Sequence, residues 1–343
     1  MQLPSASDGV PGSSGRVSPG ILRDPQGRVL DSLRLSITDR CNLRCRYCMP
    51  ETGIVQVAHD DILGYEEMHR LVALLCGLGV RRVRITGGEP LLRRGVVDFL
   101  SRLGRIPSGP ELLLTTNGLL LKDKLGALRN AGVRRINLSL DSLDRATYQR
   151  ITRRDGLAEV LPLLDDVPAA DMTLKVNMVA LSGINDHEIP RFADLARQRN
   201  LQVRFIEPMP FDGGGPWTPF EGDRILERLA DLPGFDEAVS TSEGVAECYR
   251  IEGWLGSFGI IRGHSRTFCS TCSRLRISAD GGLRTCLYGD PVVDLRRLLR
   301  SGAPDQDVAE AIILAVSHRF IDGHEAEQEH QAGGHHSMAS IGG

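Results

Sequence analysis

The sequence predicts an α/β protein with an incomplete barrel of six βα units, followed by a C-terminal α+β domain. Short apolar or β-branched runs alternate with amphipathic helical stretches from residue 33 onward, which is typical of parallel βα units. Polar loops rich in Gly, Asn and Pro follow the runs. After residue 208 the alternation stops and a segment rich in Gly and Pro begins. Six units rather than eight favour a barrel that is open on one side.

The runs and stretches give the expected elements in order. The expected strands are residues 33–37, 83–86, 112–115, 136–140, 174–179 and 203–206. The expected helices are residues 65–76, 96–103, 122–130, 157–164 and 188–199. The polar loops are residues 86–90, 115–118, 139–142 and 207–210. Because a barrel brings the carboxyl ends of its strands to one face, we expect these loops to share the active-site face.

The C-terminal part carries different signals. A helix is expected at 223–232, a hairpin at the turn Ala279-Asp280-Gly281-Gly282 and a late helix at 307–320. The predicted organisation is a disordered tail, the partial barrel, a C-terminal domain and a flexible tail that ends in Gly-Gly. Their boundaries are residues 1–22, 23–210, 211–325 and 326–343.

The bulk composition excludes several classes of protein. The 343 residues are 41% hydrophobic and 25% charged, as in ordinary globular proteins. A net charge of −3 argues against a general nucleic-acid or membrane binder, which needs a broad basic excess. No apolar run approaches the roughly 20 residues that span a bilayer. The first residues lack the basic-then-apolar order of a secretory signal, so we expect a cytoplasmic protein.

Eight cysteines are present, and three of them form a tight first group. Cys41, Cys45 and Cys48 have the spacing C-x3-C-x2-C directly after the first expected strand. Three thiolates on one loop can hold three irons of a four-iron cluster and leave the fourth iron free to bind a small molecule. The alternative is a zinc site, which usually needs four ligands, and no fourth ligand is adjacent.

Cys269, Cys272 and Cys286 form a second group with the spacing C-x2-C-x13-C. A zinc knuckle is a serious alternative on spacing alone. Arg274 and Arg276 follow directly, and strand alternation would place both guanidiniums on one face. Two arginines beside a cluster form a site for phosphates, because each guanidinium can donate two parallel hydrogen bonds.

The first group resembles the radical S-adenosylmethionine (SAM) superfamily, which is named for this C-x3-C-x2-C motif. The resemblance implies an incomplete six-unit barrel, a 4Fe-4S cluster that cleaves SAM, and a 5′-deoxyadenosyl radical. The aromatic residue before the last cysteine also fits, as does the Gly-Gly-Glu-Pro turn after the second strand, whose glycines let a ligand approach the backbone. The implied SAM contacts are Tyr47, Gly87, Gly88, Glu89, Ser139 and Met209.

A longer string resembles one branch of that superfamily, the GTP 3′,8-cyclases of molybdenum cofactor biosynthesis. The string runs from Phe268 to Arg276 and continues at Asp280-Gly281 and Cys286-Leu287. The opening residues 33–41 and the ending 338–343 resemble the same branch. This resemblance implies a second 4Fe-4S cluster, held by the second group of cysteines, whose open iron binds guanine.

The resemblance also implies a reaction and the residues that serve it. A radical abstracts hydrogen from ribose C3′ of GTP, and C3′ then attacks guanine C8 to give (8S)-3′,8-cyclo-7,8-dihydroguanosine 5′-triphosphate. The implied substrate contacts are Arg34, Arg82, Arg84, Thr115, Lys175, Arg274 and Arg276. The implied catalytic residues are Arg34, Arg274, Arg276, Gly342 and Gly343.

Partners are implied in the same way. They are GTP and SAM as ligands, a second copy of the chain in a homodimer, a downstream cyclic pyranopterin monophosphate synthase, and an electron donor such as flavodoxin or ferredoxin. Two other functions stay open at this point: another radical SAM enzyme with an auxiliary cluster, and a zinc-stabilised binding protein. Cys76 is expected in the core, Cys248 has no assigned role, and the histidine-rich stretch 330–336 is interpreted as a polar linker.

Overall fold

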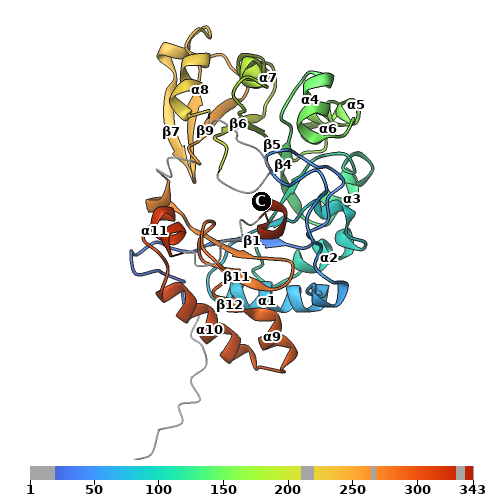
Figure 1. The fold of residues 1–343 in the computed structure, drawn as a ribbon, viewed down its shortest axis with the longest axis vertical. Helices are drawn as coiled ribbons and strands as arrows, with labels where there is room; N and C mark the ends of the chain where they lie inside the picture. The colour runs from blue at the N-terminus through green and yellow to red at the C-terminus, as the bar shows by residue number, and fades with distance from the viewer. Residues whose placement is uncertain (1–19, 210–219, 264–267, 330–336, 343) are drawn as a thin grey trace, which may run out of the picture.

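The computed structural model describes residues 20–209, 220–263, 268–329 and 337–342 (Figure 1). Most of the expected N-terminal tail, the Gly/Pro-rich segment after residue 210, the histidine-rich stretch 330–336 and Gly343 lie outside the described residues.

The described strands form one twelve-stranded sheet in the order β12-β11-β10-β1-β2-β3-β4-β5-β6-β9-β8-β7. Its centre consists of six parallel strands in chain order: β1 (Ser32–Ser36), β2 (Arg82–Thr86), β3 (Glu111–Thr116), β4 (Val133–Ser139), β5 (Thr173–Val179) and β6 (Gln202–Ile206). All six coincide with the expected strands, so the prediction of an incomplete six-unit barrel is confirmed. In Figure 1 the helices lie outside the curve of this sheet.

The helices that follow the central strands also agree with expectation in most places. They are α1 (Tyr65–Gly77), α2 (Val96–Leu103), α3 (Leu125–Asn130), α4 (Arg145–Thr152), α5 (Leu157–Val160), α6 (Leu163–Ala169) and α7 (Ile189–Gln198). The expected single helix at 157–164 is wrong: Pro162 separates α5 from α6, because proline removes a helical hydrogen bond. Helix α4 was not expected, since few of its residues are apolar and its start depends on Asp144, which accepts a hydrogen bond from Thr147 N at 2.8 Å.

The chain after residue 220 extends the same sheet at both edges. Strand β9 (Ser257–Ile261) pairs in parallel with β6 and carries the hairpin of β7 (Val239–Glu243) and β8 (Ala246–Arg250). Strand β10 (Arg274–Ile277) pairs in parallel with β1 and carries β11 (Gly282–Arg284) and β12 (Val293–Asp294). Pairings across such sequence distances leave no local periodicity, so the sequence did not predict them.

The remaining helices cover the C-terminal strands and reach the site. They are α8 (Gly222–Leu229), α9 (Leu295–Arg300), α10 (Asp305–Ser317), α11 (Gly323–Gln328) and α12 (Met338–Ile341). The expected helices at 223–232 and 307–320 correspond to α8 and α10, and the expected hairpin is β10–β11. Figure 1 shows the C-terminal turn, in dark red, inside the curve of the sheet next to β1.

One apolar core lies between the sheet and its helices and includes residues of both halves of the chain. On β1, Leu33 and Leu35 are fully buried in this core, whereas Arg34 faces the cavity inside the curve of the sheet. The strand alternation therefore separates an apolar outer layer from a polar interior. Among the described residues, no helix is both long and apolar enough to cross a membrane.

Candidate active site

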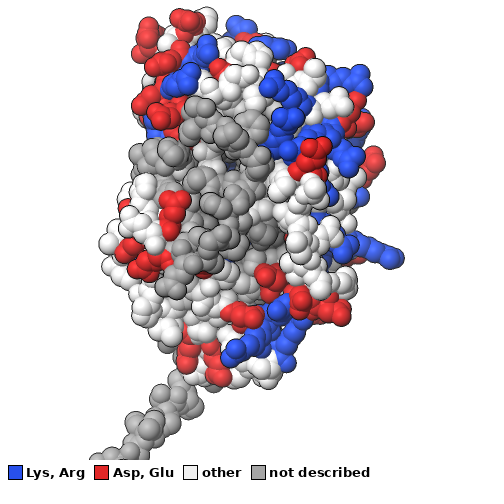
Figure 2. All heavy atoms as spheres, in the orientation of Figure 1, with Lys and Arg blue, Asp and Glu red and all other residues white. Residues whose placement is uncertain are grey.

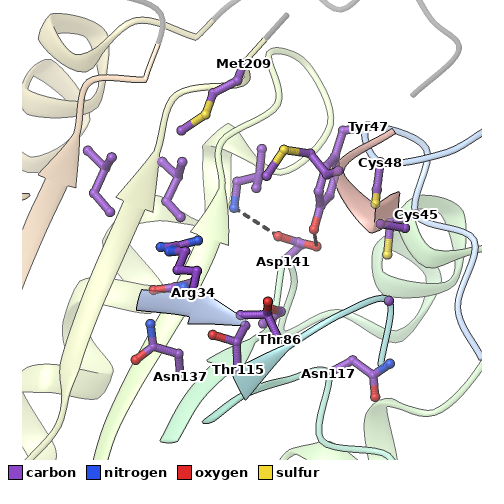
Figure 3. Close-up of a pocket in the computed structure, with 18 of the residues that line it drawn as sticks. Arg34, Cys45, Tyr47, Cys48, Thr86, Thr115, Asn117, Asn137, Asp141 and Met209 are labelled. Atoms are coloured by element: carbon purple, nitrogen blue, oxygen red, sulfur yellow. Dashed lines mark hydrogen bonds between the residues drawn. The ribbon is translucent and has the colours of Figure 1, made fainter. Parts of the chain in front are cut away.

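A cavity of about 390 Å³ lies within the curve of the sheet, at the carboxyl ends of the central strands (Figure 3). It brings together residues from all six central strands or their following loops, from β10 and from α12. Twelve of the residues expected from the sequence line it: Arg34, Cys41, Cys45, Tyr47, Cys48, Gly87, Gly88, Thr115, Ser139, Met209, Arg274 and Arg276.

The first cysteine group lies on a loop that neighbouring elements hold in place. Arg44 N and Arg46 N donate to the carbonyls of Thr152 and Ile151 at the end of α4, each at 3.0 Å. The side chain of Arg153 donates back to Arg44 O at 2.8 Å and to Met49 O at 3.2 Å. The end of α4, the helix that the sequence did not predict, therefore fixes the backbone that carries Cys45 and Cys48.

The three thiols face the cavity in a buried setting. Burial raises the pKa of all three thiols, that of Cys48 to about 12, and the charges of neighbouring thiols add to this effect at Cys45 and Cys48. Protonated thiols therefore dominate in the metal-free protein, and a bound metal would displace their protons. Three cysteines side by side at a cavity suit a cluster that also has to contact a small molecule. Figure 3 shows Cys45 and Cys48 on one side of the cavity, with Arg34 across from them.

Tyr47 is oriented by a buried carboxyl group. Its hydroxyl donates to Asp141 Oδ2 at 2.8 Å, and Val179 N donates to Asp141 Oδ1 at 2.9 Å (Figure 3). Burial raises the pKa of the Asp141 carboxyl to about 6, although both hydrogen bonds lower it. Asp141 thus links the cysteine loop to strands β4 and β5.

The Gly-Gly-Glu turn has a structural reason that differs from the expected one. A Cβ atom on Gly87 would lie 2.5 Å from Thr38 O, and one on Gly88 would collide with Arg40 O. The glycines therefore let this turn pack against the backbone that leads into Cys41. Glu89 is buried beneath the turn and does not line the cavity: its carboxylate accepts from Thr116 Oγ1 at 2.9 Å and from Asn117 N at 2.8 Å. Burial raises its pKa to about 7.

Three arginines, Arg34, Arg274 and Arg276, line the cavity opposite the first cysteine group, and a fourth, Arg84, lies beside Arg34 in the sheet. Arg34 on β1 is in register with Arg84 on β2 and with Arg276 on β10, and Arg274 lies two residues before Arg276. Burial and mutual repulsion lower the pKa of Arg34 well below its usual value, that of Arg276 to about 10 and that of Arg84 to about 9. In the described part of the chain, none of the four forms an ion pair with a carboxylate. Buried cations in this state favour an anionic ligand.

The other expected basic residues lie elsewhere. Arg82 forms an ion pair with Asp31 at 2.6 Å and has a half-exposed side chain, so the structure does not bring it to the cavity. Lys175 on β5 is buried and Arg84 on β2 is half-buried, and neither is among the lining residues. Lys175 is in register with Asn137 and Gln202 on the neighbouring strands.

The second cysteine group lies beside the first cavity. Cys269, Cys272 and Cys286 line a small hollow of about 30 Å³. Arg274 and Arg276 line both this hollow and the main cavity, as do Phe268 and Leu287. Burial raises the pKa of Cys269 and Cys286. Burial also acts on Cys272, but Arg274 and Arg319 outweigh it and lower the pKa of that thiol.

The C-terminal residues enter the site. Arg276 Nη1 donates to Gly342 O at 2.9 Å, and Ser337 Oγ donates to Cys48 O at 2.7 Å. Gly342 has a φ of 84°, and a Cβ atom there would lie 2.8 Å from the Cβ of Ser36 and 2.9 Å from Thr86 Oγ1. Only glycine fits this position without strain. Gly343 lies outside the described residues.

Several lining residues were missed by the sequence analysis. Asn137, Asn177 and Arg204 face the cavity from β4, β5 and β6. Within the part of the chain that the structure describes, the buried Oδ1 atoms of both asparagines have no hydrogen-bond partner, as expected for atoms that bind a ligand. Strand alternation could have indicated both asparagines, because residues two apart on a strand face the same side. Asn137 is two residues before Ser139, and Asn177 is two residues after Lys175.

The two remaining cysteines line neither hollow. Cys76 is buried on α1, as expected, and Cys248 is buried on β8 with its Sγ 3.4 Å from Gln202 Nε2. Within the described residues, no group of three or more His, Cys, Asp or Glu side chains is arranged to hold a single metal ion.

Comparison with known proteins agrees with this geometry. Residues 35–196 match the family described as the Radical SAM superfamily, and residues 201–324 match the family described as Molybdenum Cofactor Synthesis C. The solved structure of Streptococcus suis SuiB bound to S-adenosylmethionine aligns with a TM-score of 0.61 over 77% of this chain and 62% of that one. At 15% sequence identity this likeness shows the fold alone.

The open barrel with three thiols at its mouth places the chain in the radical SAM class of proteins. A GTP 3′,8-cyclase of Moorella thermoacetica is 41% identical over 94% of this chain and 100% of its own length. One of Geobacter sulfurreducens is 41% identical over 94% of this chain and 99% of its own length. The chain belongs to the GTP 3′,8-cyclase family.

Proposed function

We propose that this protein is a lyase that converts GTP to (8S)-3′,8-cyclo-7,8-dihydroguanosine 5′-triphosphate in molybdenum cofactor biosynthesis. The observation that carries the proposal is a pair of neighbouring hollows, each lined by three cysteines, that share Arg274 and Arg276. Over the ranges that the structure describes, neither arginine has a carboxylate partner. The relatives named above carry the name of this activity.

Two 4Fe-4S clusters belong to the proposal. Cys41, Cys45 and Cys48 would hold the first, and bound SAM with this cluster would supply the radical chemistry. Cys269, Cys272 and Cys286 would hold the second. The residues present fit both groups, because each trio faces a hollow and its members interact electrostatically with one another.

The protein's own residues bind and orient the two ligands. Arg34, Arg274 and Arg276 would hold the triphosphate, since guanidinium groups match phosphate oxygens in geometry and charge. Thr115 and the asparagine amides would contact the nucleoside part. Tyr47, Gly87, Gly88, Ser139 and Met209 would contact SAM nearer the first cysteine group. Gly342, whose carbonyl accepts a hydrogen bond from Arg276, would support the arginine side of the site.

The partners are proposals of the same kind. We expect a homodimer, a downstream cyclic pyranopterin monophosphate synthase that consumes the product, and flavodoxin or ferredoxin as electron donor. Figure 2 shows Lys and Arg gathered over the region of α4 to α6, and α4 contacts the first cysteine loop. A basic surface there would suit an acidic electron donor. Thiolate-held clusters need a reducing compartment, which supports a cytoplasmic location.

The decisive assay is an anaerobic incubation of the reduced protein with SAM and GTP. The proposal predicts 5′-deoxyadenosine together with the cyclised guanosine triphosphate. Formation of 5′-deoxyadenosine without any cyclised guanosine product would show that GTP is not the substrate. The Cys45→Ala variant should form neither, because it lacks a ligand of the first cluster.

A further inference from the structure

A buried network of charged side chains lies beside the second cysteine group, and two of its members, Arg28 and Arg319, line the same small hollow. Asp24 and Arg28 belong to a short turn near the start of the described chain, closed by the bridge between Arg23 and Val29. Arg319 follows α10, nearly 300 residues later. The side chains of all three are at most 8% exposed. Asp24 and Arg28 precede residue 35, where the match to the radical SAM family begins.

The carboxylate of Asp24 joins the two arginines. Its Oδ2 accepts from Arg28 Nε at 2.5 Å and from Arg319 Nη1 at 3.0 Å. Its Oδ1 accepts from the backbone N–H groups of Gln26 and Arg28, which fixes the turn. Every hydrogen-bonding direction of this buried carboxylate is therefore in use, as a buried charge requires.

The arginines connect this carboxylate to all three segments that carry the second cysteine group. Arg28 Nη1 donates to Cys269 O at 2.9 Å. Arg319 donates to Cys272 O at 2.8 Å through Nη1 and to Thr285 O, the residue before Cys286, at 2.9 Å through Nε. The backbone next to each of the three cysteines is thus linked, through Arg28 or Arg319, to the carboxylate of Asp24.

We infer that Asp24, Arg28 and Arg319 are positioning residues that hold the second cysteine trio ready for its cluster and set the charge around it. Two guanidinium groups and one carboxylate leave one net positive charge beside three sulfur ligands. That charge favours the reduced state of a cluster, because the reduced cluster is the more negative of the two states. The inference rests on the proposed second cluster.

The test uses the full-length protein with Cys41→Ser, Cys45→Ser and Cys48→Ser, so that only the second trio can hold a cluster. After anaerobic reconstitution, three quantities are measured: iron per chain, the rate of iron loss to a chelator, and the reduction potential of the cluster. Arg319→Gln should speed iron loss by about ten-fold or more, the usual effect of removing a group that orients metal ligands. It should also shift the potential to a more negative value.

Two further variants separate charge from geometry. Arg319→Lys keeps the positive charge but cannot reach two carbonyls and the carboxylate together, so it should lose iron faster while the potential stays close to that of the parent. Arg70→Gln is the matched control: Arg70 also joins a carboxylate (Asp305) and a carbonyl (Ala303) of the C-terminal part, at 2.7 and 2.6 Å, but does not contact the cysteines. It should change neither iron retention nor potential.

The outcomes distinguish a failure of this inference from a failure of the proposed second cluster. A parent protein that takes up zinc, or no iron, refutes the second cluster itself. A parent that holds iron and loses it no faster after Arg319→Gln refutes the role of the Asp24 network. Arg319→Gln is also placed in the opposite background, with Cys269→Ser, Cys272→Ser and Cys286→Ser. Equal iron loss from the first trio there would overturn the inference, because Arg319 would then support the whole fold.

Discussion

At the scale of single residues, the inner face of the sheet holds arginines that have no carboxylate partner in the described segments of the chain. Arg34 and Arg274 are half-buried, and their charged neighbours among the described residues are other arginines and the thiol of Cys272 rather than carboxylates. Such an arrangement costs folding free energy, since burial and repulsion both act against the charged state. A bound triphosphate would remove that cost.

Replacing Arg274 tests whether these arginines bind the triphosphate of GTP. Arg274→Ala should weaken GTP binding about 10- to 100-fold, because a hydrogen bond to a charged group contributes about 1.5–3 kcal/mol. Cleavage of SAM in the absence of GTP should persist, since Arg274 lies across the cavity from the first cysteine group. Binding is measured by anaerobic equilibrium titration. Arg145→Ala, which removes an exposed ion pair with Asp155, is the control and should leave GTP binding unchanged.

The site could be predicted from the sequence only where short motifs carry it. The two cysteine groups, Arg34 and the Arg274–Arg276 pair are marked by spacing and by strand alternation. Asp24, Arg28 and Arg319 gave no signal, because their meeting depends on contacts across nearly the whole chain. Glu89 and Arg82 were expected at the cavity and lie outside it, since a motif does not show where a side chain turns.

At the scale of elements, the end of α4 controls the first cysteine loop. Arg153 adopts a φ of 58°, an uncommon conformation for a residue with a side chain, and its guanidinium reaches Arg44 O and Met49 O. A left-handed backbone conformation costs a residue with a side chain about 1–2 kcal/mol, and these contacts stabilise it here.

The Arg153→Gly variant separates the two effects. Glycine accepts the backbone conformation, so the thermal midpoint should stay nearly unchanged while the loop loses its two side-chain bonds. Iron should then leave the first cluster faster than in the parent, measured with the second trio replaced by serine. Unchanged iron retention would show that the backbone bonds to Thr152 and Ile151 suffice.

The C-terminal turn α12 is a second element with a local role. Gly342→Ala would place a methyl group against Ser36 and Thr86 and force a residue with a side chain into a left-handed conformation. We expect the turn to leave its place and the yield of cyclised product to fall about five- to thirty-fold, the factor that corresponds to the 1–2 kcal/mol that this conformation costs. The thermal midpoint should stay close to the parent's, and a variant with full product yield would contradict the placement of this turn.

At the scale of the whole molecule, the C-terminal strands complete the sheet rather than form a separate layer. Strands β10 and β9 pair with the first and last of the central strands, and one core includes residues of both halves. The sequence predicted the six central units because each is local, and it missed these edge pairings because they are not.

Because both halves of the chain contribute strands to one sheet, we expect them to unfold together. Chemical denaturation of the anaerobic protein should give one cooperative transition, with far-ultraviolet circular dichroism and tryptophan fluorescence changing together. Trp254 reports on the C-terminal part, where it packs on Phe258 of β9. Two separated transitions would show that the halves are energetically independent.

Iron and sulfide content per chain tests the central claim most directly, because that claim is two three-cysteine sites in neighbouring hollows. Anaerobically reconstituted protein should hold about eight irons and eight sulfides, four of each per cluster. Replacing either trio by serine should halve both values. Zinc at either trio, or a wild-type chain that holds only about four irons, would contradict the account.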